Sequence, residues 1–375
     1  MTNNMNINDL VNGCMDAIKN KTKNLKTLNI MIIGKTGVGK STLVNEVFRD
    51  NIAATGIGSP VTQHMQKCTK KDVPLVIYDT KGFELERKVQ QEIKNELIEK
   101  IKEGRKSRDI NQAIHCIWYC VNACDDRFEP SEEQWIREFT RQNEEYQIPV
   151  IIVLTKAYFK ESAQALKKEI EARNLDVVKV LPVLAQDKEN YKAYGLDTLI
   201  EVMEQSLPDE MVDTLMSIQI SNLALKQKKS QAAVAAAAMS AAAAGATPIP
   251  FSDAVVLVPI EAGMLASITV IFGFEISKSV LTGLVSTVVG TGGTTMAGRA
   301  LVTNLLKMIP GLGSLAGGVI SGATAALLTT ALGEAYIALM TAMFNGEINV
   351  RDLETEKGQD KLNKLFKKEL EKKRS

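Results

Sequence analysis

A glycine-rich segment that ends in a lysine and two hydroxyl side chains is the part of the chain best suited to chemistry. Its residues are Gly34, Lys35, Thr36, Gly37, Val38, Gly39, Lys40, Ser41 and Thr42. Glycines let the backbone turn its N–H groups inward at a helix N-terminus, which makes a concave site for an anion. We expect Lys40 to contact β- and γ-phosphate oxygens and the Ser41 hydroxyl to ligate Mg²⁺. The pattern therefore predicts a site for a nucleoside triphosphate.

Two further segments carry groups that suit a metal-bound triphosphate. Asp79 directly follows the apolar run 75–78, and Gly82 comes three residues later. An acid at a strand end beside the phosphate loop can hold the Mg²⁺ shell through water, and the Gly82 N–H can meet the γ-phosphate. Between these motifs, residues 58–62 predict a flexible loop whose Thr62 hydroxyl completes the Mg²⁺ coordination. The predicted metal ligands are Ser41, Thr62 and Asp79, and the predicted catalytic groups are Lys40, Thr62 and Gly82.

Apolar runs alternate with helical patterns over residues 28–206, and this order positions the motifs. The predicted strands cover residues 28–33, 75–78, 114–121, 150–154 and 177–183, and the predicted helices cover residues 41–49, 86–103, 131–142, 161–174 and 195–206. Such alternation predicts a mostly parallel sheet with helices on both faces, the α/β fold of P-loop nucleoside triphosphatases. The loops that carry the motifs then lie at the carboxyl ends of the strands, where such sheets bind ligands.

Charged residues are distributed very unevenly along the chain. Residues 231–346 contain seven of the 89 Asp, Glu, Lys and Arg residues, together with 15 of the 25 glycines. Alanine and glycine at this density are typical of helices that pack closely, in a protein core or in a bilayer. Residues 254–274 and 308–333 are each long enough to cross a hydrocarbon core, which needs about 20 apolar residues. We expect an all-α, Ala/Gly-rich hydrophobic domain here, either at a membrane or folded against the first domain.

The motifs of the first domain resemble those of the Era/TrmE-like branch of small GTPases, over residues 28–206. The branch has a Lys-Ser-Thr-Leu helix start, a Pro-Val-Thr switch and an Asp-Thr-x-Gly-Phe strand end, and residues 40–43, 60–62 and 79–83 match these. The resemblance implies that GTP and Mg²⁺ bind and that GTP is hydrolysed. It also implies a switch in which Thr62 and Gly82 sense the γ-phosphate.

The base-binding part of the resemblance is incomplete. The branch's Asn/Thr-Lys-x-Asp motif follows the strand at 150–154, where this chain has Thr155, Lys156, Ala157 and Tyr158. The aspartate that accepts from the guanine N1–H and amine is missing. The resemblance still implies that Thr155 and Lys156 lie at the base and that Ala185 offers it a backbone N–H. An ATPase, or a nucleotide hydrolase of relaxed base choice, therefore stays open.

Two other departures concern catalysis. Phe83 follows Gly82 where Ras-type enzymes carry the glutamine that orients water, so slow intrinsic turnover is expected. Gly37 stands where potassium-activated relatives carry asparagine, so no potassium requirement is expected.

A further alternative is an assembly or membrane-remodelling module, in which nucleotide drives self-association and catalysis is secondary.

The second half of the chain also resembles a known domain. Residues 248–253, 309–313 and 330–333 are similar to a domain of unknown function that follows bacterial GTPase domains and is described as membrane-associated. The resemblance implies membrane lipid as a partner. The last fifteen residues carry seven basic and two acidic side chains, with an apolar stripe at helical spacing. Such a helix suits an anionic membrane surface and equally suits one face of the helical domain.

Composition and cysteine usage exclude some classes of protein. A net charge of +1 gives no overall field for nucleic acid, so DNA is not expected as a partner. The first residues show no signal-peptide pattern, so a reducing cytoplasm is expected. Cys116, Cys120 and Cys124 lie near His115 at a spacing of four, but the spacing matches no zinc or iron–sulfur pattern. We expect the first two to be buried thiols on a strand.

The predicted organisation has five parts. They are an N-terminal helix and connector at 1–27, a P-loop GTPase domain at 28–206, a polar linker helix at 207–230, a hydrophobic helical domain at 231–346 and a basic amphipathic helix at 347–375. The principal hypothesis is a slow, Mg²⁺-dependent GTPase switch with its G domain in the cytoplasm, coupled to a helical domain that is membrane-associated or membrane-inserted. A protein effector or activator and nucleotide-dependent self-association are further expected partners.

Overall fold

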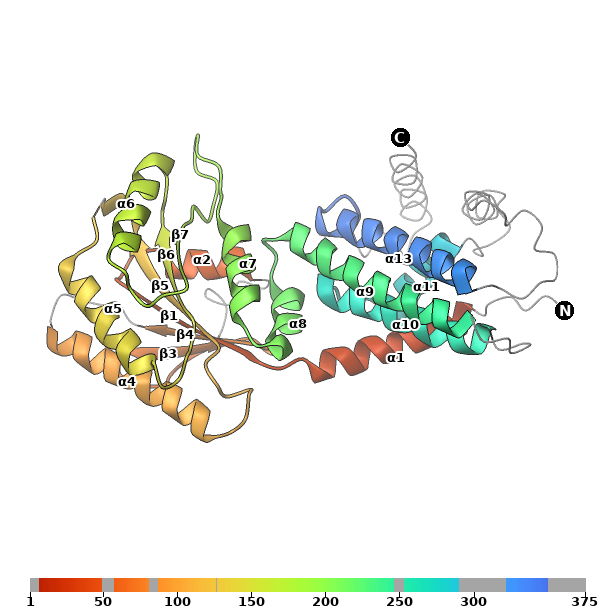
Figure 1. Cartoon of the computed structure of the whole chain (residues 1–375), viewed down its shortest axis with the longest axis horizontal. Helices are drawn as coiled ribbons and strands as arrows, with labels where there is room; N and C mark the ends of the chain where they lie inside the picture. Colours follow the sequence, from red (N-terminus) through yellow and green to blue (C-terminus); the bar gives the residue numbers. More distant parts are fainter. Residues whose placement is uncertain are drawn as a thin grey trace. The chain divides into compact units, whose positions relative to one another are not determined.

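The chain divides into a unit built on a sheet and a unit built of helices (Figure 1). The computed structural model describes residues 7–48, 57–80, 87–125, 127–245, 253–289 and 322–349. The sheet unit is Leu25–Asn222. The helical unit combines Met1–Asn24 with Leu223–Ser375.

Seven strands form one sheet in the order β2-β3-β4-β1-β5-β6-β7. The strands are β1 Leu28–Gly34, β2 Ile57–Pro60, β3 Met65–Thr69, β4 Leu75–Thr80, β5 Cys116–Asn122, β6 Val150–Thr155 and β7 Lys179–Pro182. From β4 to β7 the neighbours are parallel, whereas β3 is antiparallel to both β2 and β4. Every residue of β1 and β6 is buried, as expected for strands covered on both faces. The predicted mostly parallel α/β sheet is confirmed.

Helices pack on both faces of the sheet. They are α2 Lys40–Val47, α4 Arg87–Lys106, α5 Pro130–Asn143, α6 Lys160–Ala172, α7 Leu196–Ser206 and α8 Asp209–Ile218. On one face, α4, α5 and α6 share a core with β1, β5 and β6, in which Trp135 stacks on Phe139 with ring centroids 5.1 Å apart. On the other face, Phe48 stacks on Trp118 at 5.8 Å, and α2 contacts α7 and β1.

Two strands differ from the sequence-based prediction. Residues 57–60 form β2, where a flexible loop was predicted over 58–62, and β3 was not predicted at all. Both strands are short and contain few apolar residues, so they lack the periodic signal of the inner strands. They form because β3 pairs with β4, with Met65 opposite Thr80, and β2 adds to β3 at the sheet edge.

The described helices of the helical unit are α1, α9, α10, α11 and α13. Their bounds are Ile7–Asn24, Leu223–Gly245, Asp253–Phe272, Lys278–Val289 and Gly322–Phe344. Leu10 and Val11 of α1 are fully buried in one core with Leu265 of α10 and Tyr336 of α13. At Gly333, a Cβ atom would lie 2.4 Å from the Val234 side chain, so glycine permits the close approach of α13 to α9.

The boundaries of the units fall at other places than the composition suggested. The helix at the start of the chain runs to Asn24 and packs within the helical unit. The segment 207–230, predicted as one linker helix, contains α8, which belongs to the sheet unit, and the start of α9, which belongs to the helical unit. Pairing of α1 with α10 joins segments that are more than 200 residues apart, which no local pattern reports.

The segments considered as membrane spans are described in part. Residues 254–272 lie in α10, whereas residues 308–321 of the second segment lie outside the described residues, as do residues 350–375 of the basic C-terminal segment. Throughout the described ranges, no helix has the length and hydrophobicity needed to cross a membrane.

Candidate functional site

The phosphate loop joins the carboxyl end of β1 to the N-terminus of α2. β1 ends at Gly34 and α2 begins at Lys40. Gly37 and Gly39 have φ angles of 75° and 106°, which residues with a Cβ atom rarely adopt. The elements that flank the loop are those predicted, and the two glycines account for the tight turn between them.

The N-terminus of α2 faces outward at this loop. Gly39 is the N-cap residue, and no side chain caps the first N–H groups of the helix. Thr36, Ser41 and Thr42 are exposed around it, whereas Val38 is buried. The first N–H groups of a helix have no partner within it and carry the positive end of its dipole. This arrangement can bind phosphate oxygens.

Lys40 is buried beneath the loop. Its Nζ donates to the carbonyl oxygens of Gly34 at 2.9 Å and Lys35 at 3.4 Å, and lies 3.9 Å from Oδ1 of Asp79. The ammonium group therefore lies between the loop backbone and the acid near the end of β4. Because it has three rotatable donors, it can exchange a carbonyl oxygen for a phosphate oxygen without moving far.

Asp79 and Ser41 provide the oxygen donors that Mg²⁺ prefers. Asp79 lies opposite Ile32 of β1, and its buried Oδ1 has no hydrogen-bond partner among the described residues. Burial raises the pKa of Asp79, and the nearby Lys40 lowers it. A cation beside this carboxylate would favour its ionised form. The donors fit the ion: the exposed Ser41 hydroxyl would bind it directly, and Asp79 would bind it through water.

Thr62 has a different partner in the structure from the predicted one. The residue is half-buried in the turn after β2, and its hydroxyl donates to a carboxylate oxygen of Glu96 on α4. Next to it, Nε2 of His64 lies 3.5 Å from a carboxylate oxygen of Glu92 on the same helix. Gly82, the other predicted sensor of the γ-phosphate, lies outside the described residues. Sequence patterns did not indicate Glu92 or Glu96, because both occupy a polar helix face of ordinary composition.

Thr155 and Lys156 at the end of β6 bind the phosphate loop from its other side. The Thr155 hydroxyl donates to the carbonyl oxygen of Val38 at 2.6 Å, and Nζ of Lys156 donates to that of Gly37 at 2.6 Å. Ala185 is half-buried after β7. The backbone after β7 stays close to the end of β6, because the Ala157 N–H donates to Val183 at 3.2 Å. The predicted base-side residues therefore lie around one end of the loop.

An aromatic group occupies the position of the missing aspartate. Tyr158 packs edge-on against Tyr191, with ring centroids 5.6 Å apart, and Nζ of Lys188 lies 5.4 Å from its ring. The hydroxyl of Tyr194 fixes this segment by donating to the carbonyl oxygen of Ala157 at 2.8 Å. Tyr191 and Tyr194 were not predicted, since they belong to a loop without a periodic pattern. The base side thus presents rings where relatives present a carboxylate.

Two basic side chains, Lys35 and Arg127, form ion pairs with glutamates at the start of α5. Lys35 lies 3.3 Å from the carboxylate of Glu132, which is buried at the start of α5. Burial raises the pKa of Glu132, and Lys35 lowers it. Arg127 forms an ion pair with Glu129 at 2.7 Å. Lys35 therefore connects the phosphate loop to α5.

The cysteines of β5 are buried as predicted. Cys116 and Cys120 are in the core, and burial raises the pKa of each thiol to about 12. Cys124 is exposed, and its thiol donates to the carbonyl oxygen of Lys156 at 3.3 Å. In the described part of the chain, no three Cys, His, Asp or Glu side chains are grouped as metal ligands.

Two protein families match different parts of the chain. Residues 29–156 match the family described as 50S ribosome-binding GTPase. The sheet unit has the mostly parallel α/β sheet of a G domain and is similar to this GTPase family over the matched residues. Residues 213–375 match a second family, described as a domain of unknown function (DUF697).

Similar proteins are distant and matched only in part. Neuronal-specific septin-3 of Rattus norvegicus is 23% identical over 208 residues, which is 46% of this chain and 57% of the relative. GTPase Era of Mycobacterium tuberculosis is 24% identical over 213 residues, which is 52% of this chain and 66% of the relative. The chain spans about half the length of the first curated relatives it matches.

Two solved structures match part of this chain with low sequence identity and low TM-scores. The FeoB G-domain from Methanococcus jannaschii is 17% identical, covers 48% of this chain and 97% of its own, and gives a TM-score of 0.28. Toc33 from Arabidopsis thaliana in complex with GDP and Mg²⁺ is 17% identical, covers 54% and 90%, and gives 0.32.

Proposed function

We propose that this protein binds GTP with Mg²⁺ and hydrolyses it to GDP and phosphate as a slow molecular switch. The observation that carries the proposal is the position of Lys40, whose ammonium group lies between the phosphate-loop carbonyls and Asp79. Lys156 and Thr155 bind the same loop from the base side. The phosphate loop is therefore contacted both by Lys40, which would bind the phosphates, and by Thr155 and Lys156, which would lie beside the base.

In this proposal, different residues bind the phosphates, the Mg²⁺ ion and the base. The N–H groups at the start of α2 and the Lys40 ammonium group bind phosphate oxygens, which replace the carbonyl acceptors of Gly34 and Lys35. Ser41 and Asp79 hold Mg²⁺, which neutralises charge on the phosphate oxygens. Lys156 packs its stem on the base, and Ala185 offers a backbone N–H to it.

The switch acts through Thr62. To join the Mg²⁺ and γ-phosphate, the Thr62 hydroxyl has to leave Glu96 of α4. The hydroxyl therefore has two alternative partners, and the nucleotide state selects between them. Phe83 has no group that orients water, which supports slow intrinsic turnover.

Lys40→Ala tests the proposal directly. The purified chain is titrated with a fluorescent GDP analogue and with GTP, with and without Mg²⁺, and phosphate release is measured. Loss of a charge-assisted contact predicts affinity at least about 100-fold weaker in the variant. Lys167→Ala is the matched control, because this α6 lysine pairs with Glu171 at 3.7 Å, away from the loop. Equal binding and hydrolysis by Lys40→Ala and the parent would refute the assigned site.

A nucleotide hydrolase of relaxed base choice is the second candidate function. It is favoured by Tyr158 and Tyr191, whose rings can stack on any purine without distinguishing its edge. Competition of the GDP analogue by ATP separates the two candidates. Tyr158→Asp is expected to improve the preference for GTP over ATP, because it restores an acceptor for the guanine edge. If ATP fails to compete even in large excess, the chain selects guanine by other groups.

We also propose that the helical unit attaches the switch to the cytoplasmic face of an anionic membrane. Support comes from the charge-poor segment 231–346 and from α9, where Met239 is 70% exposed beside alanines. The full chain should float with phosphatidylglycerol vesicles and less with phosphatidylcholine vesicles. Absence of flotation with GTP and with GDP would contradict attachment. Turnover that rises with protein concentration would instead support nucleotide-driven self-association.

A further inference from the structure

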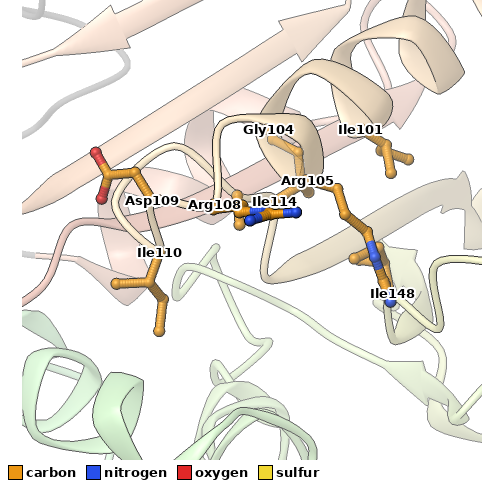
Figure 2. Close-up of a pocket in the computed structure, with 9 residues that line it drawn as sticks. Ile101, Gly104, Arg105, Arg108, Asp109, Ile110, Ile114 and Ile148 are labelled. Carbon is orange, nitrogen blue, oxygen red and sulfur yellow. The ribbon is translucent and has the colours of Figure 1, made fainter.

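The sheet unit contains a pocket of about 320 Å³ at the C-terminal end of α4. Figure 2 shows the side chains around it. Ile101 and Arg105 come from the last turns of α4, Arg108, Ile110 and Ile114 come from the segment that follows, and Ile148 precedes β6. The volume lies in the range of small-molecule sites.

The pocket lies at the amino ends of the parallel strands, whereas the phosphate loop lies at their carboxyl ends. Ile114 and Ile148 lie two residues before the first residues of β5 and β6, so they are at the amino ends of two parallel strands. The phosphate loop follows the carboxyl end of β1, which is parallel to β5. A ligand in the pocket would therefore not compete with nucleotide for space.

Two arginines stand over an apolar lining. Ile101 and Ile114 are buried, and Ile110 and Ile148 are half-buried. Arg105 and Arg108 are exposed, and in the described ranges no carboxylate lies within ion-pair distance of either guanidinium group. Arg105 donates one N–H to the carbonyl oxygen of Tyr146 at 3.0 Å, which leaves its other donors available.

Asp109 also lines the pocket, but its carboxylate does not neutralise Arg105 or Arg108. The Asp109 carboxylate accepts from the Asn111 backbone N–H at 2.9 Å and from the Gln112 side chain at 3.2 Å. These hydrogen bonds hold the pKa of Asp109 below its ordinary value. Figure 2 shows the carboxylate turned away from the two arginines.

Arg108 occupies a backbone position where glycine is the usual residue. Its φ angle is 54°, just beyond the end of α4, where helices commonly end in a left-handed residue. The Ser107 hydroxyl supports this turn by donating to the carbonyl oxygen of Gly104 at 2.6 Å. An arginine in this conformation carries conformational strain that glycine would avoid.

We propose that this pocket binds a small amphipathic carboxylate. The carboxylate pairs with Arg108 and Arg105, whose planar guanidinium groups match it, and the apolar chain covers Ile101, Ile114 and Ile148. Both parts contribute, because the apolar chain leaves water while the charge keeps its hydrogen bonds.

Hexanoate is the probe that tests this site. It is titrated into the full chain by calorimetry, and one saturable site is expected. Arg108→Gln should weaken binding at least tenfold, whereas Lys106→Gln should leave it unchanged. Lys106, the residue next to Arg105, is an exposed cation that does not line the pocket. Hexylamine, with the same chain and the opposite charge, should show no saturable site.

A second variant addresses the apolar part. Ile110→Asp places a negative charge at a half-buried position of the lining and should abolish hexanoate binding. Unchanged thermal unfolding temperatures show that each variant is folded. No saturable hexanoate site in the parent, equal affinity in Arg108→Gln, or equal binding of hexylamine would each overturn the proposal.

Discussion

Two buried lysines, Lys40 in the sheet unit and Lys226 in the helical unit, both donate hydrogen bonds to backbone carbonyl oxygens. Nζ of Lys40 donates to the carbonyl oxygens of Gly34 and Lys35 at 2.9 and 3.4 Å. Nζ of Lys226 donates to those of Ile271 and Phe272 at 2.6 and 3.4 Å. Both ammonium groups therefore bind two consecutive carbonyls.

Their surroundings differ. Lys40 lies beside Asp79 and under a loop with exposed residues on both sides, so a ligand can reach its amine. Lys226 is fully buried, its amine lies 5.9 Å from the Phe344 ring, and its two acceptors are at the C-terminal end of α10. The same hydrogen bonds are exchangeable where the backbone is an open loop and permanent where they satisfy the last carbonyls of a packed helix.

Lys226→Ala should have the largest effect on stability. It leaves two helix-end carbonyls without this donor and should lower the free energy of unfolding of the helical unit by about 3 kcal/mol. Nucleotide affinity should stay as in the parent. Denaturant unfolding followed by circular dichroism, with Lys40→Ala measured alongside, checks both halves. The distinction between the two lysines fails if Lys40→Ala unfolds the protein as easily as Lys226→Ala.

His115 makes a buried hydrogen bond in the sheet unit that we expect to be as permanent as those of Lys226. It is buried, its Nδ1 accepts from the Asn29 N–H at 3.0 Å, and burial lowers its pKa from 6.5 to about 4. The neutral ring is favoured in the folded state, so stability is present above pH 6.5 and is lost as the pH falls through about 4. The loss should reach about 3 kcal/mol at most.

His115→Asn is the matched variant for this measurement. Its side-chain oxygen can accept the Asn29 hydrogen bond but does not titrate in this range. Its free energy of unfolding should change less between pH 7 and pH 4 than that of the parent. A parallel decline in both proteins would assign the acid sensitivity to other groups.

Gly333 measures how tightly the helical unit packs. A Cβ atom there would lie 2.4 Å from Val234 and 2.9 Å from Met264, so Gly333→Ala should cost about 2 kcal/mol of unfolding free energy. Gly263 has nothing within 4 Å of the corresponding position. Gly263→Ala should therefore stabilise α10 by about 0.5–1 kcal/mol. Thermal unfolding temperatures of both variants are measured. If both variants lose the same amount of stability, close helix packing is not the reason for glycine at position 333.

Glu96 gives the smallest expected effect. Glu96→Gln weakens the acceptor that competes for the Thr62 hydroxyl, so affinity for a non-hydrolysable GTP analogue should rise about three-fold. Affinity for GDP should not change, since only the γ-phosphate state needs Thr62. A rise in both affinities would mean that Glu96 acts on the site by another route.

Local spacing was sufficient to predict the inner strands and the phosphate loop. β1, β5 and β6 are continuous apolar runs, and the glycines, Lys40 and Ser41 have fixed spacing between a strand and a helix. The partners of these groups were not predictable in the same way. Glu96 for Thr62 and Glu132 for Lys35 are polar residues on helices, with nothing in the neighbouring sequence that selects them.

The sequence alone determined a phosphate-binding loop on a parallel α/β sheet and a separate charge-poor helical region, because both depend on residue types at short spacing. Tertiary structure alone decided that α1 packs with α10, that β2 and β3 extend the sheet, and that Arg105 and Arg108 stand over one apolar pocket. These features depend on contacts between segments distant in the chain, and their free energy is gained only when those segments meet.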